Sequence, residues 1–290
     1  MRGYSSISRG VSEGLLAFVA LITGAASGQG DATARVLADE GCILALCDLN
    51  SCASLAQEVI NAGGQAAAFE VNLASTASIE QLAADVLEQF GAVDILVNNA
   101  GIGGGVPLTL NGVPGDEVTE AQRSAMFAAN WDRNMSINLQ AQVTLSQLLL
   151  PSLMRNGEGR IVNVASTEGL GATIFNAAYV AAKHGVVGLT KAMAVELGSQ
   201  GVTVNCICPG PIRTGMTDAI PEKSKEQYAR RLSPVRRYAG AEEVAQVTCS
   251  VCLPASSYLN GCIINVDGGL VANNALLPFR LPWTDSDGNP

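Results

Sequence analysis

A tyrosine and a lysine four residues apart carry the clearest chemistry in this sequence. Tyr179 and Lys183 lie inside a helical pattern that covers Ala177–Leu197. Residues i and i+4 share one face of a helix, so the phenol and the ammonium group are neighbours. A free tyrosine has a pKa of about 10, and a nearby cation favours the phenolate. The pair predicts a proton-transfer site, although the same spacing also occurs in exposed pairs without a function.

Two polar residues upstream support the catalytic interpretation. Ser166 stands between the apolar run Arg160–Val164 and the helical pattern that carries Tyr179. Its hydroxyl can donate a hydrogen bond to a substrate oxygen and stabilise charge that develops there. Asn138 lies inside a predicted helix, where asparagine is unfavourable. It is a candidate for holding a water that relays protons to Lys183.

A glycine-rich turn predicts a nucleotide site. Gly24, Gly28 and Gly30 follow an apolar run and open a helical pattern. Such a turn lets a pyrophosphate approach the backbone, and the helix N-terminus offers free N–H groups. Asp48 closes the next apolar run after Gly30, where a carboxylate accepts from ribose hydroxyls and repels a 2′-phosphate. No lysine or arginine lies in the turn or next to Asp48, so the sequence favours NAD over NADP.

The elements that must position these residues alternate along the chain. Seven near-continuous apolar runs separated by helical patterns indicate a parallel sheet with helices on both faces. This is a doubly wound, Rossmann-like α/β fold, in which ligands bind at the carboxyl ends of the strands. The predicted strands are Leu16–Ile22, Cys42–Cys47, Ala66–Val71, Asp94–Val97, Arg160–Val164, Val202–Cys208 and Cys262–Val266. The predicted helices include Asp31–Glu40, Thr76–Gln89, Asn134–Met154 and Ala177–Leu197.

The same alternation predicts one domain, because no linker divides the chain. We assign residues 14–269 to that domain, 1–13 to an N-terminal extension and 270–290 to a C-terminal tail. Two internal stretches, Gly103–Gly115 and Met216–Arg237, fall outside the alternation. We expect the second of them to close over a bound substrate.

Composition excludes several classes of function. Hydrophobic residues make up 48% of the 290 residues and the net charge is −9, so a nucleic-acid partner is not expected. No run approaches the roughly 18 apolar residues of a membrane span. Eight cysteines with a single histidine, His184, favour buried free thiols over a zinc site. Such thiols suit a reducing compartment, so we expect a cytoplasmic protein without a bound metal.

Taken together, the motifs resemble those of the short-chain dehydrogenase/reductase family over roughly residues 15–269. The resemblance rests on Thr23–Gly30, Asn98–Gly101, Asn138, Ser166, Tyr179 with Lys183, Pro209–Thr214 and Asn265–Gly269. It implies a catalytic tetrad of Asn138, Ser166, Tyr179 and Lys183, in which the tyrosine exchanges the proton and the serine orients the substrate. The lysine would bind the nicotinamide ribose and lower the tyrosine pKa.

The resemblance also implies a set of cofactor contacts. These residues are Gly24, Ser27, Gly28, Gln29, Gly30, Asp48, Leu49, Asn72, Leu73, Asn99, Ala100, Gly101, Tyr179, Lys183, Pro209, Gly210, Ile212 and Thr214. Asn72 stands where the family often has an aspartate, but its carbonyl can still accept from the adenine amine. The chain between Gly101 and Asn138 is longer than is usual in the family.

The resulting function hypothesis is an NAD-dependent oxidoreductase that acts on a secondary alcohol or ketone. A 3-oxoacyl reductase that uses NADPH is an alternative with the same fold and tetrad, and Asp48 argues against it. A protein that binds NAD without turnover is another, and the intact tetrad argues against that. The resemblance further implies a homodimer or homotetramer. Glu168, Leu170, Phe175 and Met216 are candidates for the substrate pocket walls.

Overall fold

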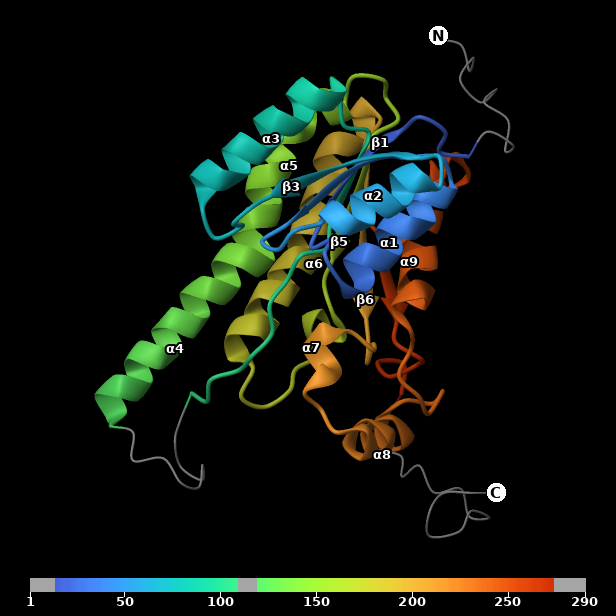
Figure 1. Cartoon of the computed structure of the whole chain (residues 1–290). Helices are drawn as coiled ribbons and strands as arrows, with labels where there is room; N and C mark the ends of the chain where they lie inside the picture. The colour runs from blue at the N-terminus through green and yellow to red at the C-terminus, as the bar shows by residue number, and fades with distance from the viewer. Residues whose placement is uncertain (1–13, 109–118, 274–290) are drawn as a thin grey trace.

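Seven parallel strands in the order β3-β2-β1-β4-β5-β6-β7 form the centre of the protein (Figure 1). The structure is a computed structural model that describes residues 14–108 and 119–273. The strands are β1 (Val19–Thr23), β2 (Ile43–Asp48), β3 (Gln65–Glu70), β4 (Ile95–Asn98), β5 (Arg160–Val164), β6 (Thr203–Pro209) and β7 (Ile263–Val266). All seven predicted strands are therefore present, and every pairing between neighbours is parallel.

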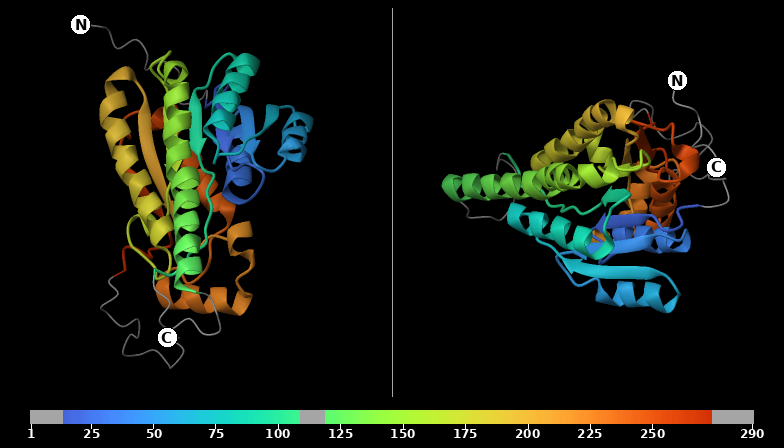
Figure 2. Two further views of the ribbon diagram at one scale, coloured as in Figure 1. Left: turned by 90° about the vertical axis from the view of Figure 1, so that its left-hand side faces the viewer. Right: turned by 90° about the horizontal axis from the view of Figure 1, so that it is seen from above.

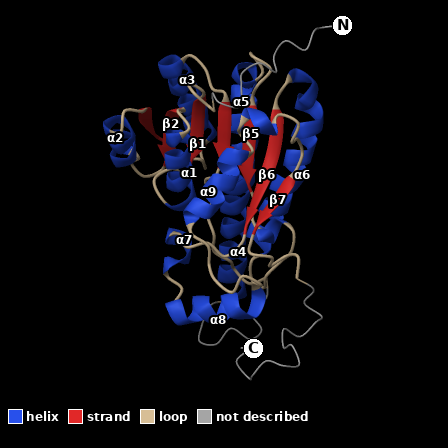
Figure 3. Cartoon of the chain, turned by 90° about the vertical axis from the view of Figure 1, so that its right-hand side faces the viewer, coloured by secondary structure: helices blue, strands red, loops and turns tan. Residues whose placement is uncertain are grey.

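Helices cover both faces of this sheet (Figure 3). The α-helices are α1 (Gly28–Asp39), α2 (Ala53–Asn61), α3 (Thr76–Phe90), α4 (Glu120–Met135), α5 (Ala141–Leu153), α6 (Ala177–Leu197), α7 (Gly215–Asp218), α8 (Glu222–Leu232) and α9 (Ala241–Ser250). Side chains alternate between the faces of each strand. In β1, Ala20 and Ile22 pack under α1, α2 and α9, whereas Val19 and Leu21 pack under α3, α5 and α6. The predicted doubly wound α/β fold is confirmed.

The first strand begins later than predicted. We expected it from Leu16, but the ordered strand begins at Val19 because residues 14–17 form a turn. Ala17 has a φ of 64°, which belongs to the left-handed region and cannot continue into a strand. The Leu16 side chain is 68% exposed although it belongs to the apolar run. Hydrophobicity alone therefore placed the boundary wrongly.

The helix that carries Asn138 is longer than predicted. We expected it from Asn134, but α4 begins at Glu120 with a capping box between Thr119 and Gln122. A π-helix at Ser136–Gln140 joins it to α5, and Figure 2 shows α4 extending past the sheet along the line of α5. Most of α4 before its last turn is exposed, and most of its apolar residues are small alanines, so the large apolar side chains on which the prediction relied are few.

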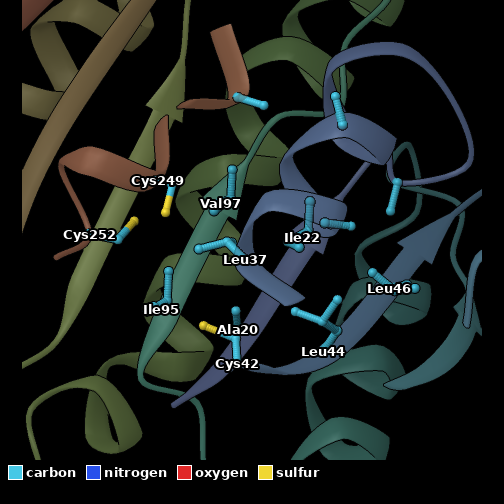
Figure 4. Packing of buried hydrophobic residues seen from close by; sticks show 14 of the residues in the cluster. Ala20, Ile22, Leu37, Cys42, Leu44, Leu46, Ile95, Val97, Cys249 and Cys252 are labelled. Atoms are coloured by element: carbon cyan, nitrogen blue, oxygen red, sulfur yellow. The ribbon is translucent and has the colours of Figure 1, made fainter. Parts of the chain in front are cut away.

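The cysteines are free thiols, as predicted, and seven of the eight are buried. Figure 4 shows Cys42, Cys249 and Cys252 among the apolar side chains of the core. Within residues 14–108 and 119–273, no group of three His, Cys, Asp or Glu side chains is placed to hold a metal. In that same part of the chain, no helix has the length and apolar character needed to traverse a bilayer. The predicted extension 1–13, and the tail from residue 274 onward, lie outside the described residues.

Candidate active site

The carboxyl ends of the strands open onto one cleft. Its lining includes all but two of the residues predicted to bind cofactor or to catalyse. The predicted residues that line the cleft are Gly24, Ser27, Gly28, Gln29, Asp48, Leu49, Asn72, Leu73, Asn99, Ala100, Gly101, Ser166, Tyr179, Lys183, Pro209, Gly210, Ile212 and Thr214. The two others, Gly30 and Asn138, lie behind the cleft wall. The structure therefore brings the separate motifs into one place.

The glycine turn between β1 and α1 depends on the absence of side chains. Gly24 and Gly28 have φ values of +72° and +57°, which disfavour any side chain. A Cβ on Gly30 would lie 2.0 Å from the carbonyl oxygen of Gly24. Gly30 is not part of the cleft lining, and its role as a cofactor contact stays a prediction. The absence of a side chain at Gly30 lets α1 pack directly against the turn.

The start of α1 fits a nucleotide. Ser27 precedes the helix without a side-chain hydrogen bond to it, so the first N–H groups have no side-chain cap. Such groups favour an anion such as a pyrophosphate. The side-chain oxygen Oε1 of Gln29 is buried and has no hydrogen-bond partner. It is an acceptor available to a hydroxyl or amide group of a bound nucleotide.

Hydrogen bonds tie the turn to the neighbouring strand end. The hydroxyl of Thr23 accepts from the backbone N–H groups of Asn99 and Ala100, at 3.0 and 2.9 Å. In return, Nδ2 of Asn99 donates to the carbonyl oxygen of Thr23 at 2.9 Å. The ends of β1 and β4 are thereby held as one unit. This part of the cleft is formed mainly by fixed backbone.

Asp48 is held in place at the end of β2. Its Oδ1 accepts from the backbone N–H of Asn50 at 2.9 Å, and Oδ2 accepts from that of Ala26 at 3.3 Å. The carboxylate thus faces the glycine turn, as the prediction of a ribose contact requires. Arg133 of α4 also lines the cleft. No local pattern signals this cation, because it lies far beyond Asp48 along the chain and only the fold brings it there.

Ser166, Tyr179 and Lys183 meet at the other end of the cleft. Ser166 follows β5, and its Oγ accepts from the backbone N–H of Glu168 at 3.1 Å. The Ser166 hydroxyl is close enough to the Tyr179 phenol to lower the pKa of that phenol. Lys183 lies one turn along α6, with Nζ 5.6 Å from the centre of the Tyr179 ring. The Nζ atom donates to the carbonyl oxygen of Val164 at 2.8 Å.

Burial controls the electrostatics of this group. It raises the pKa of Tyr179 above its ordinary value, although the hydrogen bond with Ser166 acts in the opposite direction. Burial also lowers the pKa of Lys183 to about 8. The net shift of the Tyr179 pKa in the protein without nucleotide is thus upward, and the lowering expected from Lys183 and a bound nicotinamide stays a prediction. The desolvation of the phenolate outweighs the hydrogen bond that stabilises it, so the phenol stays protonated at neutral pH.

Asn138 has a different position from the other three tetrad residues. Its side chain binds the backbone of Ile102, with Oδ1 accepting from N at 2.8 Å and Nδ2 donating to O at 3.0 Å. A Cβ on Gly101 would stand 3.0 Å from Oδ1 of Asn138 and 3.5 Å from Nζ of Lys183. The glycine therefore leaves an opening between these two atoms. The water relay through Asn138 stays a prediction.

The substrate end contains the least regular segments. The short helix α7 and the helix α8 lie beyond the carboxyl ends of the strands, within the segment expected to close over substrate (Figure 3). Of the predicted pocket walls, Met216 lines the cleft and Phe175 borders a separate apolar hollow. His184 borders that hollow too, with Nδ1 on the carbonyl oxygen of Val180 at 3.0 Å. It does not line the cleft.

Comparison with known proteins gives a consistent picture. A family model described as enoyl-(acyl carrier protein) reductase matches residues 24–271. The 3-oxoacyl-(acyl-carrier-protein) reductase FabG of Thermotoga maritima is 35% identical, over 87% of this chain and 97% of its own length. The meso-2,3-butanediol dehydrogenase of Serratia marcescens is 34% identical, over 88% of this chain and 95% of its own.

Solved structures agree with these sequence relatives. A putative NAD(P)-dependent gluconate 5-dehydrogenase from Beutenbergia cavernae, with NADP bound at low occupancy, superimposes with a TM-score of 0.78. The two chains are 32% identical, and the match covers 90% of this chain and 99% of the other. The fold is thus shared over nearly the whole described chain.

Proposed function

Because the chain belongs to the short-chain dehydrogenase/reductase family of NAD(P)-binding oxidoreductases, we propose that it oxidises a secondary alcohol, or reduces the ketone, with NAD. In this proposal Tyr179 is the acid or base, Ser166 binds the substrate oxygen, and Lys183 and Asn138 complete the tetrad. A bound nicotinamide would supply the hydride acceptor or donor. The remaining roles fall to these four side chains.

One observation carries the proposal. The side chains of Ser166 and Tyr179 line the end of the same cleft that begins at the glycine turn, and the Ser166 hydroxyl lies within reach of the phenol. A substrate oxygen placed between them receives two hydrogen bonds. Lys183 lies beside the Tyr179 ring and inside the same cleft lining. A surface pair with no function would not be buried at the end of a nucleotide cleft.

The protonation state of Tyr179 supports its role. Since burial raises its pKa, the phenol is protonated at neutral pH and can donate its proton to a carbonyl oxygen during reduction. Oxidation needs the phenolate, which is favoured at higher pH and by positive charge that enters the site. We therefore expect the rate of alcohol oxidation to rise with pH across the neutral range.

The preference for NAD rests on Asp48. Its carboxylate, oriented by Asn50 and Ala26, accepts ribose hydroxyls and repels a 2′-phosphate. Arg133 in the same cleft is the feature that favours NADP, as does the NADP reported in the structure of the Beutenbergia relative. We give Asp48 the greater weight because it stands at the strand end that faces the turn.

The decisive experiment measures nicotinamide absorbance with NAD and NADP for the wild type and Tyr179→Phe. The substrates should include a vicinal diol, a sugar acid and a simple secondary alcohol. Removing the phenolic hydroxyl should lower kcat by about 10³-fold, within the range of general acid–base catalysis. Tyr258→Phe is the matched control, because that side chain is fully exposed at 101% and lies outside the cleft lining. Unchanged turnover in Tyr179→Phe would refute the mechanism.

A 3-oxoacyl reductase is the second candidate, favoured by the 35% identity to the Thermotoga enzyme of that name. It predicts NADPH oxidation with a 3-oxoacyl thioester that is much faster than NAD reduction with any free alcohol. The opposite ratio supports the first candidate. Tight NAD binding without turnover of any of these substrates would indicate a nucleotide-binding protein that does no chemistry.

Location and assembly are further proposals. Eight free thiols, seven of them buried, are typical of a protein that works in the reducing cytoplasm. We propose a homodimer or homotetramer that takes small alcohols or ketones and binds neither nucleic acid nor membranes. Light scattering of the purified protein measures the assembly directly. A monomer at micromolar concentration would contradict this proposal.

A further inference from the structure

A column of amide side chains follows one face of the long helix behind the cleft. The amide column consists of Asn130, Asn134, Asn138 and Gln142, spaced four residues apart. It runs from α4 through the π-helix Ser136–Gln140 into α5. Asn134 and Asn138 are both 0% exposed. Asparagine disfavours helix interiors, and a buried amide is costly unless it is hydrogen-bonded, so the column needs an explanation.

The column is connected by hydrogen bonds along its length. Nδ2 of Asn138 donates to Oδ1 of Asn134 at 2.9 Å. Nδ2 of Asn134 donates to the main-chain oxygen of Asn130 at 2.9 Å. The side chain of Asn130 in turn donates to the carbonyl oxygen of Gly104 at 3.1 Å. Asn134 is therefore the buried side chain that links Asn138 to the preceding turn of α4.

Asn134 completes the set of partners of Asn138. An asparagine amide has two N–H donors. In Asn138, one donates to the carbonyl oxygen of Ile102 at 3.0 Å, and the other donates to Asn134. With both donors engaged, Oδ1 must point toward the Ile102 N–H and the opening at Gly101. If the amide of Asn138 were flipped, its Oδ1 would face Oδ1 of Asn134, and the main-chain N–H and carbonyl oxygen of Ile102 would lose their partners.

We propose that Asn134 is a positioning residue, which holds the amide of Asn138 with its oxygen toward Lys183. This inference rests on the proposed function, in which Asn138 and Lys183 belong to the tetrad. Oδ1 of Asn138 and Nζ of Lys183 lie on either side of the opening that Gly101 leaves. The predicted water relay would connect these two atoms. Asn134 fixes the position of Oδ1 of Asn138 without touching substrate.

The π-helix gives the column its shape. Single π turns are rare and concentrate at functional sites. Here the π turn spans Asn138 itself, and Nε2 of Gln142 donates to the main-chain oxygen of Asn138 at 3.1 Å. The wider turn thus leaves the main-chain oxygen of Asn138 free to accept the hydrogen bond from the Gln142 side chain. Both the main chain and the side chain of Asn138 are fixed by other members of the column.

The test is a double-mutant cycle between Asn134 and Asn138. Asn134→Leu replaces the amide by an apolar side chain of similar shape and removes both amide bonds. We expect kcat to fall about tenfold, with the KM for NAD unchanged, since one oriented hydrogen bond is worth about that factor. In an Asn138→Ala background, Asn134→Leu should cost less than about twofold, because the amide that it orients is already gone.

Two further variants guard against misfolding. Asn130→Ala removes only the outermost bond and keeps the main-chain oxygen that Asn134 uses, so kcat should stay within about twofold of the wild type. Asn134→Ser is smaller, and leaves room for a water to take the place of the amide. It should show a smaller loss in kcat than Asn134→Leu. NAD affinity and the melting temperature are measured for every variant.

The outcomes separate this inference from the proposed function. Suppose that the wild type turns over substrate and Tyr179→Phe does not. The positioning role is then wrong if Asn134→Leu keeps the full kcat, or if it lowers kcat by the same factor with and without Asn138. If the wild type turns over nothing, the proposed function fails. The side-chain amide signals of Asn138 in a ¹⁵N spectrum then still test the inference. They should be protected from exchange in the wild type and lose protection in Asn134→Leu, and equal protection in both would refute it.

Discussion

The two ends of the cleft are built from different material. The cofactor end is formed by the ends of β1, β2 and β4, where backbone groups and short side chains such as Thr23 bind one another. The substrate end lies beyond the strand ends, next to the short helices α7 and α8. There the apolar side chain of Met216 remains open, at 56% exposed.

This difference indicates a division of labour between the two ends. A cleft wall made of strand ends is fixed by the sheet, so its geometry is set before any ligand arrives. Exposed apolar side chains on short helices gain contacts only when a substrate covers them. We therefore expect changes at the cofactor end to affect every reaction equally. Changes at the other end should alter the choice of substrate and leave nucleotide binding unchanged.

The largest effect should come from a side chain added at Gly30. In Gly30→Ala, the new Cβ would lie 2.0 Å from the Gly24 oxygen and 2.6 Å from Nδ2 of Asn99, so the turn must move away from α1. We expect NAD binding to be lost and the free energy of unfolding to fall by about 3 kcal/mol, as in other overpacked sites. Calorimetric titration and thermal unfolding measure the two effects.

Gly188→Ala is the matched control for this variant. Gly188 lies inside α6, and a Cβ there would meet nothing within 4 Å. Alanine is favoured over glycine in a helix interior, so this variant should be slightly more stable and bind NAD normally. If Gly30→Ala binds NAD as tightly as Gly188→Ala does, the cofactor end is not fixed by close packing.

All the residues predicted for the cofactor end except Gly30 line one cleft. Its residues come from short motifs at strand ends, and the alternation of apolar runs and helical patterns places those ends side by side. Asp48 illustrates this, because it directly follows the apolar run that predicts β2 and therefore stands at the carboxyl end of that strand. The relation between Ser166, Tyr179 and Lys183 was predicted for the same reason.

What the sequence did not predict depends on contacts between distant segments. Arg133 enters the cleft only through the long helix α4, and most of α4 was missed because its apolar residues are mainly small, exposed alanines. The raised pKa of Tyr179 depends on burial by several elements, which no local pattern contains. The sequence does not predict that the Asn134 amide is buried, because its hydrogen bonds with Asn130 and Asn138 form only in the folded helix.

The second effect concerns Lys183, which lies with Ser166 and Tyr179 at the end of the cleft opposite the glycine turn. Its folded pKa of about 8 is lower than its ordinary value of 10.5. Between these values the unfolded chain binds a proton that the folded protein does not, so the free energy of unfolding rises with pH. The full rise in the free energy of unfolding is about 3 kcal/mol, and below pH 8 the buried positive charge destabilises the folded state by this whole amount.

Chemical unfolding of the nucleotide-free protein between pH 7 and 10.5 measures this rise. Lys183→Met should lack the slope that the buried lysine produces, while Lys191→Met on the exposed side of the same helix should retain it. The comparison of slopes is preferable to absolute stabilities, because Lys183→Met also leaves the carbonyl oxygen of Val164 without its donor. Identical slopes in all three proteins would show that Lys183 is not destabilised by burial.

The third effect is the nucleotide preference set by Asp48. In Asp48→Ala the ribose loses a charged acceptor and a 2′-phosphate loses its repulsion, while Arg133 remains. Since hydrogen bonds to charged groups are worth about 1.5–3 kcal/mol, the ratio of kcat/KM for NADP to that for NAD should rise about 30-fold. The ratio should rise equally with every substrate. A rise confined to one substrate would break the separation between the two ends.

The smallest effect is expected at Met216, on the substrate end. Met216 lines the cleft from α7, and a Cβ on Gly103 would lie 3.2 Å from its sulfur atom. In Met216→Ala, an apolar substrate loses part of its contact surface, so KM should rise about fivefold, equivalent to about 1 kcal/mol of buried area. The dissociation constant for NAD should stay within about twofold, since exposed side chains contribute little to distant sites. Met126→Ala is the control, because Met126 is 54% exposed but lies on α4 outside the cleft lining, and should change neither constant. If Met216→Ala weakens NAD as much as it weakens the substrate, α7 belongs to the cofactor end, and the boundary between the two ends lies on its far side.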